Sequence, residues 1–382
     1  MSDWLVLGLF AIAFYLFECC TWTPATVFAC YRKPLRIRWA AAPGSELPGN
    51  ESGGLALSDP LTLSGSIMHA AHWPIAVSPE GVCADHPDAD QFWPFAAIES
   101  IRAHDNTVRI NGEIACRTAS EALATGLARD LESLRQLPAG ERAKAIRSLL
   151  RESFDAEVLE STWSRFKQSS RRLALVAKLP LMWLLVVTPI AIVALGPLRA
   201  WPYLLGGLFL SALIVSIHYI RVHRRELPDG ADRWLHAVSM TLFPIAAIRA
   251  VDRISKERIS RFNPLAVAAV FCGHADADAL LRRGGFDLER TDTLASEPAA
   301  ARCQEWYRAQ KRAAFNESLR ALKRNPFTAP ERIDDAVSLY CPRCHSQFED
   351  GVSECADCGD VALIPLPGAA VEEPRSRERK RA

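Results

Sequence analysis

Two pairs of cysteines near the C-terminal end have the residue type and spacing to bind a metal ion. Cys341 and Cys344 form a Cys-x2-Cys pair, ten residues follow, and Cys355 and Cys358 repeat the pair. Each pair can direct two thiolates at one ion, and four thiolates complete the tetrahedral shell that Zn²⁺ prefers. The sequence therefore predicts a structural zinc site with these four ligands, and a rubredoxin-like iron site is the alternative with the same ligands.

The segment around these cysteines, residues 339–366, contains few large apolar side chains. A module this poor in core residues gains its folding free energy from the ion. We therefore expect the segment to be unfolded without metal. A structural site of this kind explains how a module folds and leaves the activity of the protein open. The large apolar residues of the segment are chiefly Phe348, Val352, Leu363 and Ile364.

The four cysteines resemble those of zinc ribbons, specifically the short ribbons that end many bacterial proteins. The resemblance covers residues 339–366 and implies that the four cysteines are the zinc ligands. One position departs from the ribbon pattern, because His345 follows the second cysteine where Gly is usual, whereas Gly359 keeps the pattern. His tolerates the left-handed backbone conformation of that position, and it is also a competing candidate ligand.

Two other groups of residues could be proposed as metal sites from their types, but each is better explained by the secondary structure around it. His69, His72, Cys83 and His86 repeat the ribbon spacing, but the apolar run between the two pairs indicates a core strand. The acidic residues of His274-x-Asp276-x-Asp278 suit the start of a helix, where the helix dipole favours negative charge. The sequence contains no Gly-rich phosphate loop, nucleophile elbow or His-Glu-x2-His motif.

Three apolar segments have the length of membrane-spanning helices. They are Trp4 to Tyr31, 173–195 and 201–220, and the length of each is near the roughly 20 residues that an α-helix needs to cross a bilayer. We therefore predict an α+β membrane protein with three transmembrane helices, the first in residues 1–31 and the second and third in 173–220. The short loop at Gly196 is expected to be a turn.

The positive charges beside these segments predict the orientation in the membrane. Clusters of Lys and Arg follow the first span, precede the second and follow the third. Such clusters stay on the cytoplasmic side. We therefore expect the N-terminus outside a bacterial inner (plasma) membrane, and residues 32–172 and 221–382 in the cytoplasm. Glu18 and Lys178 would lie at similar depth and could pair, or each could extend separately to the headgroups.

The remaining chain divides by composition into segments of distinct character. The net charge of +1 argues against a nucleic-acid binder. Of the 11 cysteines, the seven outside the ribbon have no regular spacing, which indicates reduced thiols. The expected segments are a basic flank and flexible linker (32–66), a β-rich domain (67–137), a helical linker (138–172), a helical juxtamembrane and cytoplasmic region (221–338), the zinc ribbon (339–366) and a disordered basic tail (367–382).

The β-rich domain is expected to consist of short strands followed by one helix. Asn111-Gly112 between two alternating runs predicts a hairpin with a type I′ turn. A stripe of Leu123, Leu127, Leu131 and Leu134 predicts an amphipathic helix that ends before Pro138. This order of elements over 74–136 resembles the pleckstrin-homology-like (PH-like) domains of bacterial membrane proteins. The resemblance implies a small β-barrel that binds peptides, proteins or lipid headgroups.

A basic amphipathic helix is expected after the third span, with Ile248, Val251, Ile259 and Phe262 along its apolar face. It could lie on the anionic inner leaflet, or it could pack in a soluble helical domain.

These features favour a non-enzymatic, membrane-anchored scaffold or regulatory protein whose partners are membrane lipids and another protein. One alternative is a membrane-associated enzyme with an unrecognised site. Another is a membrane-tethered nucleic-acid-binding protein, which the acidic surroundings of the ribbon disfavour because Arg343 is its only basic residue.

Overall fold

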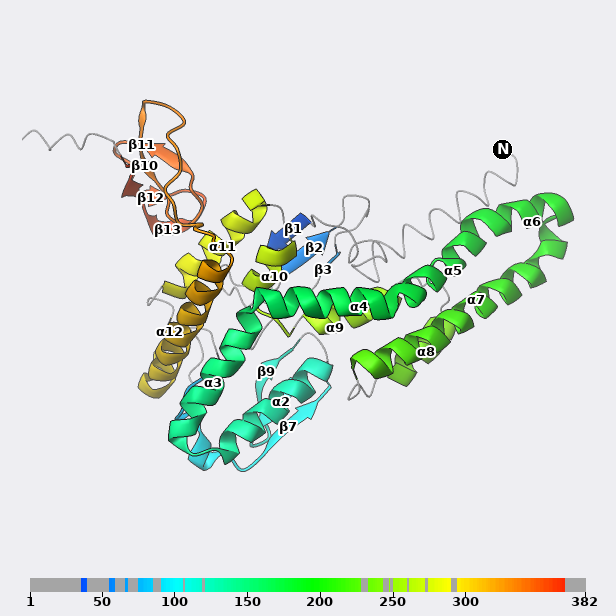
Figure 1. Ribbon diagram of the computed structural model, residues 1–382, viewed down its shortest axis with the longest axis horizontal. Coiled ribbons are helices and arrows are strands. Elements are labelled where there is room, and N and C mark those ends of the chain that lie inside the picture. Colours follow the sequence, from blue (N-terminus) through cyan, green and yellow to red (C-terminus); the bar gives the residue numbers. More distant parts are fainter. Residues whose placement is uncertain are drawn as a thin grey trace, which may run out of the picture.

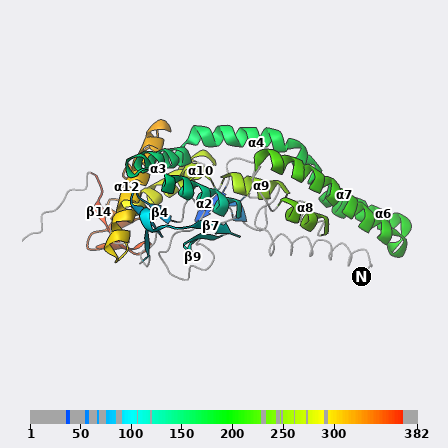
Figure 2. The same cartoon turned by 90° about the horizontal axis from the view of Figure 1, so that it is seen from below.

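The structure, a computed structural model, describes residues 36–39, 55–58, 66–67, 75–84, 91–105, 107–118, 121–227, 233–242, 247, 250–259, 261–271, 274–289 and 294–367. The molecule is elongated, with a helical hairpin at one end, a small β-module at the other and a mixed α+β body between them (Figures 1 and 2). The predicted first span, Glu18 and most of the basic tail lie outside the described residues.

The β-rich part of the body consists of two antiparallel sheets and a covering helix. The sheets have the orders β4-β5-β6 and β7-β8-β9. Their strands are β4 (Ile75–Val77), β5 (Gly81–Ala84), β6 (Phe92–Pro94), β7 (Ile101–His104), β8 (Thr107–Ile110) and β9 (Glu113–Arg117), and the helix is α2 (Glu121–Gln136). A third small sheet pairs β1 (Arg36–Trp39), β2 (Leu55–Ser58) and β3 (Ser66–Ile67) in that order.

Two local predictions about this region are confirmed. Asn111 and Gly112 have φ of 53° and 87°, the positive values that a type I′ turn between β8 and β9 requires. The Asn111 side-chain oxygen also accepts hydrogen bonds from the backbone N–H groups of Glu99 and Ser100. Of the leucine stripe on α2, Leu127, Leu131 and Leu134 are buried, so this face covers the β7-β8-β9 sheet.

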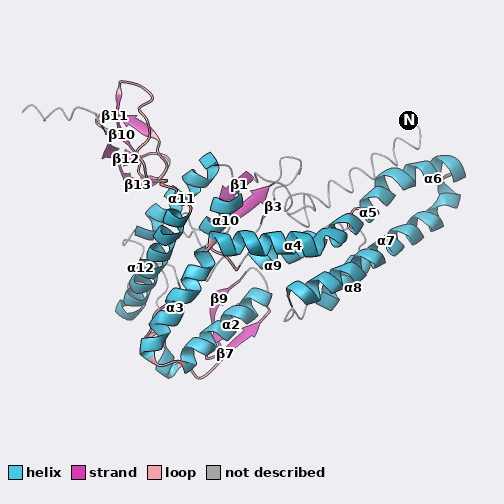
Figure 3. Ribbon diagram, viewed as in Figure 1, coloured by secondary structure: helices cyan, strands magenta, loops and turns pink. Residues whose placement is uncertain are grey.

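Long helices form the rest of the body, and strands gather in a few places along the chain (Figure 3). These helices are α3 (Ala139–Phe154), α4 (Ala156–Val176), α9 (Ala250–Ile259), α10 (Pro264–Phe271), α11 (His274–Glu289) and α12 (Pro298–Ala321). Aromatic residues link them: Trp163 of α4 meets Phe271 of α10 edge-on at 5.2 Å between ring centroids.

Helix α12 packs on the sheet that contains β4 and β5, so segments more than 200 residues apart in sequence share one core. The Cys83 thiol lies 3.6 Å from the Ala300 carbonyl oxygen, and the Cys303 thiol lies 3.6 Å from that of Ala76. A single cluster of buried apolar residues runs from Ile75 to Leu319. The two soluble regions expected from the sequence therefore form one body, and α3 and α4 are part of its core.

The hairpin consists of an interrupted helical arm and one long helix. The interrupted arm contains α5 (Leu179–Met182), the π-helical segment η2 (Trp183–Val187) and α6 (Thr188–Leu195), and the other arm is α7 (Pro197–Glu226). Prolines explain the interruptions, because Pro180 and Pro189 have no N–H to donate within a helix. The Thr188 hydroxyl donates to the Trp183 carbonyl oxygen at 2.9 Å. As predicted, the arms are joined by a tight turn, at Gly196 with φ of 76°.

The two arms approach closely where Gly207 of α7 faces Trp183 of η2. The Trp183 indole N–H donates to the Leu204 carbonyl oxygen at 3.0 Å. A methyl group at Gly207 would lie 1.9 Å from Trp183 Cζ2, so only glycine leaves room for the indole ring. Ser211, the other small residue of the Gly207-x3-Ser211 pattern, is buried.

Among the described residues, one helix is long and apolar enough to cross a membrane, and it is Arg199–Glu226 within α7. Only 33% of the most apolar 18-residue stretch of this helix is buried, whereas the core helix of a soluble protein is mostly buried. The predicted second span at 173–195 is not one continuous helix, because α4 ends at Val176 and the prolines divide the rest of the arm. Three transmembrane helices are therefore not established by the structure.

Helices α8 (Arg233–Leu242) and α9 follow the hairpin. Val251 and Ile254 of α9 are fully buried, and α9 packs against α4 and α7. Of the two interpretations of this amphipathic helix, the structure favours packing within the body, because its apolar face contacts protein. Helix α8 has a different environment, with large apolar side chains exposed on one side.

Candidate functional site

The C-terminal module contains two small antiparallel sheets. One has the order β11-β10-β14 and the other pairs β12 with β13. Their strands are β10 (Val337–Tyr340), β11 (Gln347–Glu349), β12 (Glu354–Cys355), β13 (Gly359–Ala362) and β14 (Ile364–Pro365). Each Cys-x2-Cys turn lies beside the first strand of its hairpin, so the two hairpins bring the turns together.

The structure brings all four predicted ligands to one place. The sulfur atoms of Cys341, Cys344, Cys355 and Cys358 all lie within 4.8 Å of one another. Cys341 and Cys355 are buried, whereas Cys344 is exposed. Four thiolates at such separations form a donor set that can hold a metal ion, and they suit the tetrahedral, all-sulfur shell of a structural site. Such a shell leaves no position for a substrate.

The backbone of both turns has the conformation expected from the sequence pattern. His345 has φ of 67° and Gly359 has φ of 70°, so each residue after the second cysteine of its pair is left-handed. The His345 N–H donates to the Cys341 carbonyl oxygen at 2.9 Å. The expectation that histidine can replace glycine here is confirmed.

The His345 side chain turns toward Tyr340 instead of joining the cysteine cluster. The two rings meet edge to face with centroids 5.5 Å apart. Burial, together with the positive charge of Arg282, lowers the pKa of His345 to about 4. The group of mutually close ligand atoms contains the four cysteines and not His345.

The thiols of the cluster differ in acidity in the absence of metal. Burial raises the pKa of Cys341 to about 11. Burial also opposes ionisation of Cys344, but hydrogen bonds from the Ser346 hydroxyl and backbone N–H outweigh it and lower its pKa to about 7. Burial also raises the pKa of Cys358. Because metal ligands must be deprotonated, a bound cation would have to displace protons chiefly from Cys341 and Cys358.

Helix α11 holds the module against the body. Arg343 of the first turn donates two hydrogen bonds to Asp287 of α11, from Nε to Oδ1 at 2.9 Å and from Nη2 to Oδ2 at 3.1 Å. Phe286 packs against the small core formed by Cys341, Cys355 and Val361. The module is therefore docked through an ion pair beside an aromatic contact.

Arg282, one turn before Phe286, binds the connection between the body and the module. Its Nε donates to the Pro326 carbonyl oxygen at 3.0 Å, and its Nη1 lies 3.5 Å from the Cys344 carbonyl oxygen. The sequence pattern of α11 did not identify this contact region, although Arg282 and Phe286 have the i, i+4 spacing of one helix face.

The two other metal-binding interpretations gain no support from the described residues. Cys83 is buried in β5 with its thiol near the Ala300 carbonyl oxygen, while His69, His72 and His86 lie outside the described residues. Asp278 forms an ion pair with Arg324 at 3.1 Å. In the part of the chain that the structure describes, the cysteine cluster is the one group found close enough to hold a metal ion.

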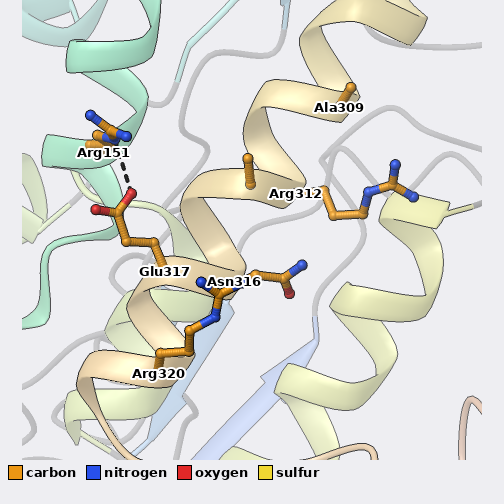
Figure 4. Close-up of a pocket in the computed structure, with 7 residues that line it drawn as sticks. Arg151, Ala309, Arg312, Asn316, Glu317 and Arg320 are labelled. Atoms are coloured by element: carbon orange, nitrogen blue, oxygen red, sulfur yellow. Dashed lines mark ion pairs between the residues drawn. The ribbon is translucent and has the colours of Figure 1, made fainter.

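A solvent-open hollow of about 600 Å³ lies between α3 and α12 (Figure 4). Its polar lining is mainly basic, with Arg151, Arg312 and Arg320 beside a single carboxylate, Glu317. Arg151 Nε contacts Glu317 Oε2 at 2.9 Å, and both side chains are more than half exposed. Arg312 extends away from this pair (Figure 4), and within the described residues neither Arg312 nor Arg320 has a carboxylate partner. The hollow has the charge of an anion-binding surface.

Comparison of the chain with protein-family models, with curated proteins and with solved structures finds no match. The cysteine geometry is consistent with the zinc-ribbon resemblance, whereas the PH-like resemblance of the β-rich region is not established.

Proposed function

We propose that this protein is a non-enzymatic, membrane-anchored scaffold or regulatory protein of a bacterial-type inner membrane. The hairpin enters the lipid bilayer, and the body and the ribbon lie on the cytoplasmic side. The observation that carries this proposal is the outward surface of the hairpin, where large apolar side chains face away from protein on both arms.

The exposed fractions on the hairpin are high for apolar residues. Ile190 and Val193 of α6 are 63% and 73% exposed, and Leu210 of α7 is 58% exposed. A continuous apolar surface of this kind is unfavourable in water and marks contact with a membrane or another protein. Further exposed apolar residues on the two arms are Met182, Val186, Leu195, Trp201, Tyr203, Leu205, Phe209, Leu213 and Ile217.

The dimensions and charges of the hairpin support a membrane location. Helix α7 is about 45 Å long at 1.5 Å per residue, and the arm from α5 to α6 is about 25 Å. Both are comparable with the roughly 30 Å thickness of the hydrocarbon core. Between Arg199 and Arg221 the α7 sequence contains no Lys, Arg, Asp or Glu. We propose this hairpin as the second and third spans and the segment Trp4–Tyr31 as the first.

The side of the membrane follows from the basic residues at the base of the hairpin. Arg171 and Arg172 precede one arm, and Arg221, Arg224 and Arg225 end the other. Lys and Arg beside short loops remain cytoplasmic. The shared core of β4, β5 and α12 supports a common compartment for both soluble regions, because one folded body cannot be divided by a bilayer.

The ribbon, on this proposal, binds one zinc ion through Cys341, Cys344, Cys355 and Cys358 and has a structural role. Its Arg343 is occupied by Asp287, which weakens the case for nucleic-acid binding further. We also propose that the β-rich part of the body is a PH-like domain, with α2 as its closing helix.

The hollow between α3 and α12 is the proposed contact surface for a protein partner with acidic side chains. Its arginines project into solvent, where opposite charge steers association. The protein partner expected of a scaffold would therefore present an acidic surface to this hollow.

Membrane association can be tested by extracting membranes with alkaline carbonate, which removes peripheral proteins. We expect the chain to remain in the membrane and a Val193→Asp, Leu210→Asp variant to lose stable insertion, because charged groups are costly in the hydrocarbon core. Val158→Asp is the control, since Val158 is exposed on α4 in the body. Release of the unaltered chain by carbonate would refute the proposal.

The partner surface needs a separate test. Cross-linked complexes recovered from membranes should be lost with Arg312→Glu, Arg320→Glu and kept with Arg332→Glu, an exposed arginine outside the hollow. Equal recovery from both variants would reject the hollow as the contact surface.

A further inference from the structure

Helix α8 has an apolar outer face that continues the exposed surface of the hairpin. Trp234, Leu235, Val238 and Leu242 are 54%, 71%, 53% and 62% exposed. They recur at the three- and four-residue spacing of one helix face. Ala237 and Met240, on the other side of the helix, are buried. Figure 1 shows α8 beside the part of α7 nearest the body.

Polar groups of α8 face α7, which is the reverse of the arrangement on a soluble helix. The Ser216 hydroxyl donates to the Ala237 carbonyl oxygen at 3.0 Å and lies 3.0 Å from the Thr241 hydroxyl. The Tyr219 hydroxyl lies 3.2 Å from His236 Nδ1. Hydrogen bonds between helices with apolar residues on the outside are the pattern expected in lipid, where an unpaired polar group has no water to bind.

The contacts also fix the direction and depth of α8. The Arg224 guanidinium lies over the Trp234 ring at 5.7 Å, while Thr241 meets Ser216, eight residues nearer the hairpin turn. Helix α8 therefore runs antiparallel to α7, from its basic end toward the turn. The stretch after Trp234 is about 12 Å long, which is less than the roughly 15 Å of one hydrocarbon leaflet.

The return of the chain to the body excludes a crossing by α8. Ala250, at the start of α9, is fully buried in the body, and Arg258 of α9 is bound to Glu226 at the base of α7. The chain before α8 and the chain after it therefore lie on the same side of the membrane, the side of the body. Trp234 and Arg224 mark the level of the headgroups, where Trp and Arg are favoured.

We infer that α8 is a re-entrant helix that enters the cytoplasmic leaflet and contacts lipid acyl chains through Leu235, Val238 and Leu242. This inference rests on the proposed membrane location of the hairpin and adds a third embedded element to it. Arg221, Arg224 and Arg225, all exposed, lie at the same end and match the negative charge of anionic headgroups.

Photo-cross-linking of the full chain tests this inference. A p-benzoylphenylalanine residue replaces Val238 in one variant, Val193 in a second and Val158 in a third, and each protein is placed in nanodiscs of phosphatidylethanolamine and phosphatidylglycerol. All three valines are exposed. After irradiation, we expect a mass increase of one phospholipid at positions 238 and 193, and no lipid adduct at position 158.

The outcomes separate the inference from the proposed function. Adducts at position 193 without adducts at 238 would overturn the re-entrant helix and leave the membrane hairpin standing. Cross-links from position 238 to another segment of protein would show that protein covers this face, and would overturn it as well. Absence of lipid adducts at both 193 and 238 would reject the hairpin itself.

Discussion

Glu226 and Arg258 form a buried ion pair at the base of the hairpin. The guanidinium Nε and Nη2 donate to the same carboxylate oxygen, Glu226 Oε2, at 3.0 and 2.7 Å. The other oxygen, Oε1, accepts from the Ser169 hydroxyl at 2.6 Å. Because Glu226 ends α7, Arg258 belongs to α9 and Ser169 to α4, this cluster joins the hairpin to the body.

Removing the cation of this pair is expected to destabilise the protein. Arg258→Met leaves the Glu226 carboxylate, which is 6% exposed, without its charged partner, and such losses cost about 3 kcal/mol. The measurement is thermal unfolding of the full chain in detergent micelles. Arg151→Met is the matched control, because the Arg151–Glu317 pair is exposed and worth less than about 1 kcal/mol. Equal losses of stability in the two variants would contradict the greater contribution of the buried Glu226–Arg258 pair.

The contact between Gly207 and Trp183 gives a steric prediction with an internal control. Gly207→Ala would place a methyl group against the indole ring and should destabilise the hairpin by about 1 to 3 kcal/mol, as overpacking does. Gly206→Ala meets no atom within 4 Å and should be neutral or stabilising, since Ala is the better helix former. The same unfolding measurement applies. If Gly207→Ala did not lower the unfolding free energy, the two arms would not pack as the structure shows.

The features that could be predicted from the sequence have local causes. The four cysteines lie in one short segment, and Asn111-Gly112 specifies its own turn, so neither depends on the rest of the chain. The leucine stripe of α2 likewise follows from helical periodicity. The same local reasoning could have divided the second span, because Pro180 and Pro189 remove hydrogen bonds regardless of context.

The composite core could not be predicted in this way. Cys83 and Ala300 are 217 residues apart, and the buried sequence of β5 would be the same whichever helix covered it. Contacts of this kind depend on tertiary packing, which leaves no periodic signal in either segment. The docking face of α11 and the basic hollow were missed for the same reason, since each needs two elements to be placed together.

A pH prediction concerns Asp130 of α2. Burial raises the pKa of this carboxyl from 3.8, although the positive charges of Arg129 and Arg261 partly oppose the shift. Because the raised pKa lies in the folded state, the folded protein favours the protonated form. The ionised carboxylate therefore costs stability at neutral pH, and this cost disappears as the pH falls through the folded pKa. Asp130→Asn should accordingly raise the unfolding free energy at pH 7, and the gain should vanish in acid.

Glu132, on the same helix, is the control, because its pKa is shifted in the opposite direction from that of Asp130. A hydrogen bond from Arg135 lowers the pKa of the Glu132 carboxyl, so its small stabilising effect is present above pH 4.5 and is lost in acid. Glu132→Gln should therefore not stabilise the protein at neutral pH. Unfolding curves of both variants across this pH range provide the test, and a gain from Glu132→Gln equal to that from Asp130→Asn would contradict the assignment.

The Arg343–Asp287 pair should control docking of the ribbon without affecting its metal. Arg343 is 11% exposed, and loss of a hydrogen-bonded charge pair of this kind costs about 1 to 3 kcal/mol. We expect Asp287→Ala to increase proteolysis in the connection between α12 and β10 while the zinc content stays the same. Asp334→Ala, in that connection and exposed, should have little effect. Loss of zinc with Asp287→Ala would mean that docking and metal binding are one event.

The ribbon is expected to bind one zinc ion and to unfold when a ligand is removed. Metal binding in such modules is worth on the order of 10 kcal/mol, and the core around Cys341, Cys355 and Val361 is too small to replace it. Cys355→Ser should therefore abolish zinc binding and amide-exchange protection in β10 to β13, while β4, β5 and α12 stay protected. His345→Asn is the control, because Asn tolerates the left-handed backbone there and the His345 ring lies on Tyr340. Zinc content and exchange should be unchanged in this variant. Stoichiometric zinc in Cys355→Ser together with its loss in His345→Asn would identify His345 as the fourth ligand in place of Cys355.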